Sequence, residues 1–498
     1  MATTGDRRSA LGPVQRGVRR FRRRPLATRV RTVAVAVAVL AGLVVWLAGS
    51  PRAGAATGGG TPESSIPAST RGVTATSINV VFPVVNLNSL SGKLGFAEDA
   101  EYGQQVKAIH VFVDAINSTG GINGRKINPI ATFYDPTNAT EMRALCKDWT
   151  EGSPAAFAVL DGIGAWAEDS QLCITQEGHT PLISAWTTIP TWTKLGAPYL
   201  WWTGPNQAQV LAATVQWGLR AHLLGGGRKV GVLVGDRQSD QLALNDYLLP
   251  LLRAHHVDPT VETIAADPSE TATTQSQAPL VVAKLKLAGD TSVIPLIPFN
   301  VFFPVLQAET QQQYFPKLLL SDYEDSIESA LGLIPVPYDK ALNGQEGVTT
   351  ETLGGFDDNR PESEGGYDPG VRSCYDTWHA VHPGPIPGAS EKVPYIEEQG
   401  PIQAWCTTIR LFAAAAKAAG RDLNRRTFLE AMAKVTDFPG GYSPVWSFGP
   451  DKYAGPTEYQ VVRLHNNVGK NACVLKTNHK PQGTCWQVVS GWQPLPAG

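Results

Sequence analysis

The sequence lacks the short motifs that mark the common catalytic and metal-binding sites. It contains no G-x-S-x-G, no H-E-x-x-H and no C-x-x-C, which argues against a nucleophile elbow, a zincin site and a thiol redox or zinc-knuckle site. The glycine-rich residues 225–229 have neither the preceding strand nor the following Ser or Thr of a phosphate-binding loop. Cys374, His379 and His382 are spaced unlike a standard zinc site. We therefore expect neither enzymatic activity nor a bound metal.

A nucleotide cofactor is not indicated either. Gly162, Gly164 and Ala167 fit part of a dinucleotide fingerprint. That fingerprint needs an acidic residue at the end of the next strand to bind a ribose, and Ser184 stands there instead. We expect no cofactor.

Basic residues are scarce after residue 56, where the chain carries a net charge of about −12. A body this acidic argues against nucleic acid as a partner, because phosphate binding needs a basic face. Before it, ten Arg lie between Arg7 and Arg31, and residues 32–48 contain no charge. This pattern predicts a basic cytoplasmic segment (1–31), a signal or membrane-anchor helix (32–48) and a flexible linker (49–73). Whether the helix is cleaved stays open.

The rest of the chain is therefore expected to be exported, either anchored at the cell surface or secreted. All six cysteines fall in this exported part. An even number of cysteines in an oxidising compartment predicts three disulfides, for which fifteen pairings exist. The simplest set joins sequence neighbours: Cys146–Cys173, Cys374–Cys406 and Cys473–Cys485.

Short apolar runs alternate with helical patterns along the exported chain. Strands are predicted at 78–83, 126–134, 155–160, 181–184, 229–234, 292–297 and 317–320. Helices are predicted at 101–116, 138–150, 167–176, 207–222 and 242–255. Such alternation is typical of α/β proteins in which helices cover both faces of a parallel sheet. The length favours two doubly wound sheets over one.

The segment FVDAINSTGGINGRKI at residues 112–127 resembles the helix–turn–strand signature of type I periplasmic solute-binding proteins. Residues 177–184 (EGHTPLIS), 199–206 (YLWWTGPN), 403–420 and 438–462 follow in that family's order. The resemblance covers about residues 74–466 and is closest to the branched-chain amino-acid (leucine/isoleucine/valine) and amide-binding group of ABC transporter substrate-binding proteins. It implies two lobes joined by three hinge crossings: residues 74–203 plus 348–436, and residues 204–347 plus 437–498.

The resemblance also implies a ligand site where the strands of both lobes end. Its expected residues are Trp166, Ser184, Trp186, Thr187, Thr188, Asp236, Ser239, Asn300, Asp322, Tyr323 and Glu324. Two departures stand out. Ala165 and Trp166 occupy the place of a small hydroxyl residue that binds a ligand carboxylate, and Ser239 replaces a Tyr that closes over the ligand. Trp166 has packing in the lobe as its alternative role, and Asp322 has helix capping.

With Trp166 and Trp186 at neighbouring strand ends, an aromatic wall is expected that favours a larger or flatter amphiphilic solute over leucine, isoleucine or valine. The resemblance implies capture of a small-molecule solute for an ABC permease complex, with the N-terminal segment contacting the membrane. The alternative is a ligand-sensing receptor ectodomain of the same fold. A cytoplasmic segment of about 31 residues has no room for a signalling domain, which favours the transport role.

Overall fold

The computed structural model describes residues 67–86, 102–136, 138–164, 166, 169–185, 189–323, 338–351, 369–383, 395–441, 443–466 and 484–497. All of them belong to one compact unit, Ser64–Gly498. Within these ranges no helix is long and apolar enough to cross a membrane. The predicted membrane or signal segment at 32–48 lies outside the described residues, as do most of the linker, Cys473 and four of the expected site residues.

The first sheet has five strands in the order β2-β1-β3-β4-β5, and all of its pairings are parallel. Its strands are β1 (Ser77–Val85), β2 (Lys126–Tyr134), β3 (Ala158–Asp161), β4 (Leu182–Ser184) and β5 (Leu200–Trp202). The predicted strand at 126–134 is confirmed residue for residue. The predicted strand at 155–160 is shorter in the structure and ends one residue later, on Asp161.

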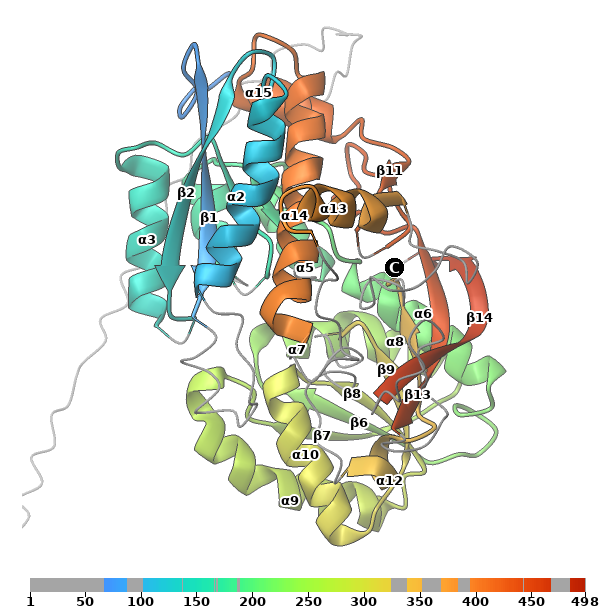
Figure 1. The fold of residues 1–498 in the computed structure, drawn as a ribbon. Coiled ribbons are helices and arrows are strands. Elements are labelled where there is room, and N and C mark those ends of the chain that lie inside the picture. The colour runs from blue at the N-terminus through green and yellow to red at the C-terminus, as the bar shows by residue number, and fades with distance from the viewer. Residues whose placement is uncertain are drawn as a thin grey trace, which may run out of the picture. The chain divides into compact units, whose positions relative to one another are not determined.

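Helices cover both faces of this sheet. Successive residues of a strand point to opposite faces, so buried side chains on both faces need helices to pack against. On one face, α2 (Tyr102–Ser118) and α14 (Tyr395–Ala418) lie side by side, α2 against β1 and β2 and α14 against β3 and β4 (Figure 1). On the other face, α3 (Ala139–Glu151) packs through Cys146 and Trp149 against Tyr134 and Trp166. The Asn138 side chain caps α3 by accepting a hydrogen bond from the Glu141 amide.

The second sheet has seven strands in the order β14-β13-β10-β9-β8-β6-β7. They are β6 (Val230–Gly235), β7 (Thr260–Ile264), β8 (Ser292–Leu296), β9 (Lys317–Ser321), β10 (Glu346–Thr349), β13 (Glu458–Asn466) and β14 (Thr484–Pro494). The pairings from β7 to β10 are parallel, whereas β13 pairs antiparallel with both β10 and β14. The predicted parallel sheet is therefore confirmed from β7 to β10, and β13 and β14 extend it with an antiparallel edge. The chain reaches β13 from the side of the first sheet and so enters against the direction of β10.

The remaining elements connect these strands. The helices are α4 (Asp169–Leu172), α5 (Pro190–Gly196), α6 (Gln207–Arg220), α7 (Gln238–Leu242), α8 (Leu249–Ala254), α9 (Thr271–Ala288), α10 (Phe299–Gln312), α12 (Asp339–Leu342), α13 (Pro369–His379) and α15 (Arg425–Met432). Cys173–Glu177 and Ala243–Leu248 form π-helical turns, Pro268–Glu270 forms a 3₁₀ turn, and β11 (Phe438–Pro439) pairs with β12 (Val445–Trp446).

The chain passes between the two sheets three times: after β5, after β10 and before β13. This matches the two-lobed α/β fold that the sequence predicts. The proposed lobe boundaries can be refined by packing. Trp446 and Phe448 lie in the same hydrophobic cluster as Trp201 of β5, so the last passage begins after them and not at residue 437.

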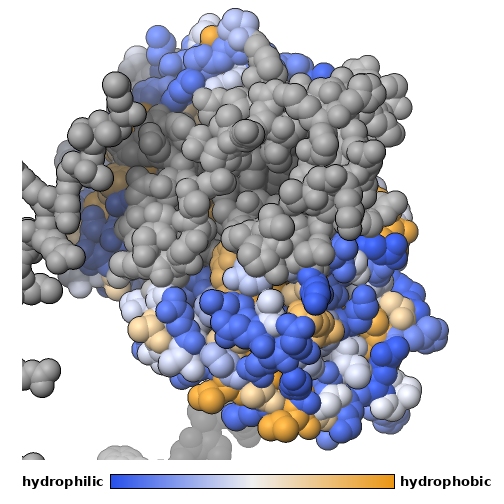
Figure 2. Space-filling view, turned by 60° about the horizontal axis from the view of Figure 1, so that its bottom comes forward, coloured by the Kyte–Doolittle hydropathy of each residue, from blue (hydrophilic) through white to orange (hydrophobic). Residues whose placement is uncertain are grey.

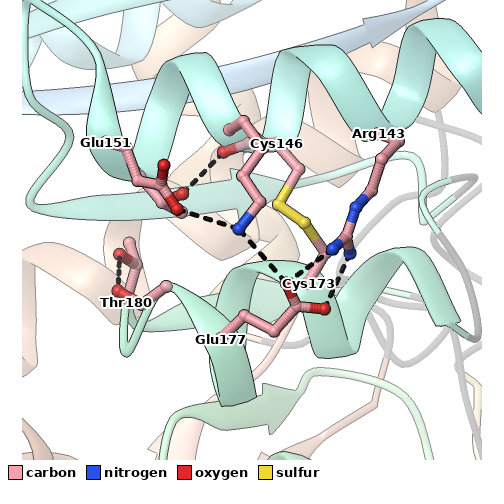
Figure 3. A network of polar contacts seen from close by, with 9 residues as sticks. Arg143, Cys146, Glu151, Cys173, Glu177 and Thr180 are labelled. Atoms are coloured by element: carbon pink, nitrogen blue, oxygen red, sulfur yellow. Dashed lines mark hydrogen bonds and ion pairs between the residues drawn. A yellow bond between two sulfur atoms is a disulfide. The ribbon is translucent and has the colours of Figure 1, made fainter.

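Two disulfides join helical segments that pack beside the first sheet. Cys146 of α3 is bonded to Cys173, and Cys374 of α13 to Cys406 of α14, so two of the three predicted pairs are confirmed. Beside the first disulfide, Arg143 and Glu177 face each other in a bidentate pair with distances of 2.7 and 2.6 Å (Figure 3). Both side chains are about half exposed, so the covalent bond holds these elements together more than the ion pair does.

Candidate functional site

The carboxyl ends of β3 and β4 are joined by a buried polar network. The Asp161 carboxylate accepts hydrogen bonds from the amides of Gly164 (3.0 Å) and Trp166 (3.1 Å). It also accepts one from the hydroxyl of Ser184 (3.2 Å), at the end of the neighbouring strand. Asp161 and Ser184 both have no exposed surface. The predicted site residue Ser184 is therefore at the expected edge, but its hydroxyl is committed to Asp161.

The chain turns sharply after Asp161 because it meets α14. A Cβ atom at Gly162 would lie 2.5 Å from Cε3 of Trp405, closer than packed atoms approach. Glycine therefore allows the loop after β3 to lie directly against an indole ring of α14.

Trp166 is a core residue in this structure. Its side chain is fully buried, its ring lies 5.0 Å from that of Tyr134 and 4.7 Å from that of Trp149, and its Nε1 donates to the Ser170 carbonyl at 2.9 Å. Contrary to the expected aromatic wall, the ring presents no surface to a solute. Its position explains this, because Trp166 packs in the hydrophobic cluster between α3 and the sheet.

At the second sheet, two predicted residues bind the backbone of the same residue, Ala266. Asp236, directly after β6, accepts a hydrogen bond from the Ala266 amide at 3.0 Å, and Asn300 of α10 donates to the Ala266 carbonyl at 3.2 Å. The structure thus brings together the carboxyl ends of β6 and β7 and the start of α10. Asn300 is buried, whereas Asp236 is exposed, so its carboxylate can also meet a solute.

Tyr323, another residue of the expected ligand site, lies in the interior of the protein. It has no exposed surface, and its hydroxyl donates to Asp240 at 2.7 Å. Asp240 is also fully buried and pairs with Arg237 through two bonds of 2.8 Å each. The Asp240 carboxylate balances the positive charge of the Arg237 guanidinium and also accepts the hydrogen bond from the Tyr323 phenol. These contacts join α7 to the end of β9.

The two remaining described residues of the predicted set are also buried. Asp322 accepts hydrogen bonds from the amide and hydroxyl of Thr350, at 2.7 and 2.9 Å, which ties the end of β9 to the end of β10. Ser239 is 4% exposed. Trp186, Thr187, Thr188 and Glu324 lie outside the described residues.

The sequence did not single out Asp161, Asp240 or Thr350. Each of them forms a hydrogen bond with a residue of the predicted site. Only Asp161 could have been found from the local sequence, because it ends an apolar strand directly before a glycine. Asp240 and Thr350 have partners 83 and 28 residues away, and no local pattern encodes such pairs.

A cavity of about 360 Å³ lies elsewhere, between α14 and α15. Four alanines line it together with Thr427, Glu430, Lys434, Val435 and Thr436, and none of these residues stands at a strand end. Figure 2 shows the surface from another side, where hydrophobic residues are interspersed among hydrophilic ones. The most exposed large apolar side chains of the described chain, Leu287 and Leu280, stand on α9. Neither the cavity nor these leucines lie at the carboxyl end of a strand.

Comparison with known proteins agrees with this architecture. The family model described as periplasmic binding protein matches residues 85–333, half of the chain. The chain therefore belongs to the periplasmic binding protein family, as the sequence predicted. No curated protein sequence matches it significantly.

Solved structures of the same fold are similar over most of the chain. A fatty acid ABC transporter substrate-binding protein from Thermomonospora curvata is 14% identical, with a TM-score of 0.59 over 85% of this chain and 93% of its own. A solute-binding protein of an ABC transporter from Rhodopseudomonas palustris, in complex with 3,4-dihydroxybenzoic acid, is 13% identical (TM-score 0.58; 84% and 98% covered). A leucine-binding protein from Thermotoga maritima is 12% identical (TM-score 0.56; 78% and 96%). At these identities the likeness concerns the fold.

Proposed function

We propose that the protein captures a small organic solute between its two lobes, outside the cytoplasm, and delivers it to an ABC permease complex. The observation that carries this proposal is the placement of polar groups at the carboxyl ends of both sheets of a family fold built for binding. In α/β sheets, ligands bind outside these strand ends. Three chain passages between the sheets allow the lobes to move as hinged bodies around a solute.

Asp236 is the described residue best placed to contact the solute. It is exposed at the end of β6, while its Oδ1 is held by the Ala266 amide. A carboxylate held in this way can accept a hydrogen bond from a hydroxyl, an amino group or another donor of the solute. Trp186, Thr187, Thr188 and Glu324 remain proposed contacts on the strength of the family resemblance.

The proposed solute is larger or flatter than leucine and has both apolar and polar parts. The position of the usual carboxylate-binding hydroxyl is occupied by Ala165 and Trp166, and the usual closing Tyr by Ser239. Relatives of the same fold include a protein named for fatty acids and one solved with 3,4-dihydroxybenzoic acid. Fatty acids and hydroxybenzoates are therefore the first solutes to test.

A thermal-shift screen of the full-length protein with fatty acids, hydroxybenzoates and branched-chain amino acids tests this proposal. One of the first two classes is expected to raise the unfolding midpoint, because a ligand that binds the native state stabilises it. Asp236→Asn keeps an acceptor for the Ala266 amide and removes the charge, so it should weaken binding about tenfold. Asp246→Asn, at another exposed position of the same lobe, is the matched control and should bind normally.

The proposal also covers activity and location. Catalysis is not expected, so the solute should be recovered unchanged, and the protein should reach the outside of the membrane either anchored or secreted. Its net negative body gives no reason to propose a nucleic acid as partner.

A further inference from the structure

Two of the three chain passages between the sheets, the first and the third, run side by side. The amide of Trp202, at the end of β5, donates to the Tyr453 carbonyl at 2.8 Å, and the Trp202 carbonyl accepts from the Gly455 amide at 3.0 Å. Trp202 therefore pairs in parallel with Ala454. Because the pairing is parallel, both passages leave the first sheet in the same direction.

We propose that these two passages form one hinge. They are joined and rigid up to Thr203 and Gly455, and they bend together just beyond, at Gly204–Pro205 and at the link from Pro456 to Thr457. A movement of the lobes then turns both passages about one short axis instead of two independent joints. This inference deepens the proposed function, because it assigns the residues about which the lobes close around a solute.

On the side of the first sheet, both passages are held firmly. The Thr203 amide donates to the Ser184 carbonyl of β4 at 2.9 Å, and Thr203 is buried. In the third passage, the Gly455 carbonyl accepts from the Ser447 amide at 2.9 Å and from Nζ of Lys452 at 3.3 Å. Lys452 is thus a positioning residue, because its ammonium group closes the hairpin that carries this passage.

The pairing between the two passages ends where the hinge begins. In a parallel ladder, the next bond beyond β5 would run from the Gly204 amide to the Gly455 carbonyl. Two other donors already occupy that carbonyl. Pro205 and Pro456 have no amide hydrogen with which to extend a ladder. Gly204, which lacks a Cβ atom, keeps more backbone freedom before a proline than another residue would have.

On the side of the second sheet, the chain is held again directly after these residues. Asn206 is the N-cap of α6, and the Thr457 carbonyl accepts from the Leu495 amide at 2.9 Å. The Gln209 side chain of α6 donates to the Pro496 carbonyl at 3.1 Å. The segment after β14 therefore joins α6 to the start of β13, so both passages enter the second lobe at one fixed place.

The part of each passage between these two sets of contacts is short. In the first passage it consists of Gly204 and Pro205. In the third passage Pro456 still lies opposite Trp446, so the chain turns at the link to Thr457. When the register of the parallel pair is continued, Gly204 comes level with Pro456, and the two turning points therefore lie side by side.

Single-molecule FRET on the solute-free, full-length protein tests this inference. Dyes attached through Asp114→Cys on α2 and Asp246→Cys in the second lobe report the distance between the lobes, since both positions are exposed. Gly204→Ala restricts the backbone before Pro205 and should narrow the spread of this distance about twofold. Gly449→Ala is the matched control, because a Cβ atom there meets nothing closer than 3.5 Å, and it should leave the spread unchanged.

Lys452→Met tests the rigid part of the third passage. Without the ammonium group, the Gly455 carbonyl loses one of its two donors, so the spread should widen about twofold. Lys434→Met, at an exposed position of the same lobe, is the control and should behave as the wild type. A Lys452→Met spread equal to that of the control contradicts the positioning role.

Hydrogen exchange of the same protein measures the pairing itself. The amides of Trp202 and Gly455 should be protected about a hundredfold more than that of Gly204. Equal exchange of the three amides, or an unchanged spread in Gly204→Ala, overturns the inference. If Lys452→Met does not fold, those two results decide. Because no solute is present, a solute screen without a hit would refute the proposed function and leave the hinge result standing.

Discussion

Asp240 shows how a single residue holds the second sheet's strand ends together. Its carboxylate is fully buried between Arg237 and Tyr323. Asp240→Ala removes the carboxylate that pairs with the partly buried Arg237 guanidinium and should lower the free energy of unfolding by about 3–5 kcal/mol. Tyr323→Phe removes only one hydrogen bond and should cost about 1 kcal/mol. Urea unfolding monitored by fluorescence measures both, and equal losses would argue against the pair as the main contributor.

Trp166 and Trp186 are expected to respond differently to the same substitution. Trp166 fills a core position, so Trp166→Ala should lower stability by about 3–5 kcal/mol. Trp186 is the remaining proposed aromatic contact, so Trp186→Ala should weaken binding of the solute found by screening by about 1–3 kcal/mol. Calorimetry and urea unfolding separate these effects. If the Trp166→Ala protein kept its normal stability but lost solute binding, Trp166 would have to contact the solute, as the expected aromatic wall requires.

At the scale of elements, the sequence predicts most of the first sheet because local patterns encode it. The strand predicted at residues 126–134 is found as expected, and the helix predicted at 138–150 is found at Ala139–Glu151. β7 and α9 are not among the predicted elements. β7 is only five residues long, and α9 contains Pro279, which is unfavourable inside a helix. The antiparallel β13 and β14 depend on where the chain returns, which no local pattern determines.

The candidate site was harder to predict than the fold for the same reason. Strand ends can be located from sequence, so Ser184, Asp236 and Asn300 do lie at them. Whether a side chain at a strand end faces solvent or a buried partner depends on contacts between distant segments. Trp166 and Tyr323 illustrate this, since both are enclosed by partners from other elements.

The disulfides should contribute substantially to the stability of the first lobe. Loops of 27 and 32 residues are closed by Cys146–Cys173 and Cys374–Cys406, and each closure is worth about 3.5 kcal/mol in the chain-entropy model. Replacing either pair by serines should lower the thermal midpoint. Mass mapping without reduction should find these two pairs and the predicted Cys473–Cys485. A free thiol at Cys473 or Cys485 would contradict the third pair.

At the scale of the whole molecule, stability should depend on pH through two buried acids. Burial raises the pKa of Asp161 to about 7 and that of Glu309 to about 8. The folded state therefore keeps protons that the unfolded chain has already lost. The free energy of unfolding should fall as the pH rises from about 4.5 to about 8, by at most about 1.4 kcal/mol per pH unit for each acid, and then level off. Urea midpoints of the wild type, Asp161→Asn and Glu309→Gln measure this. A midpoint that rises over the same range contradicts the burial of both acids.

The central claim is that the protein binds a solute and does not convert it. Equilibrium calorimetry with the fatty acids and hydroxybenzoates that pass the screen, followed by chemical analysis of the released solute, tests it most directly. The account predicts one solute per chain, weaker binding by Asp236→Asn than by Asp246→Asn, poor binding of leucine, and recovery of the solute unchanged. Tight leucine binding that Asp236→Asn leaves intact, or a chemically altered solute, would contradict it.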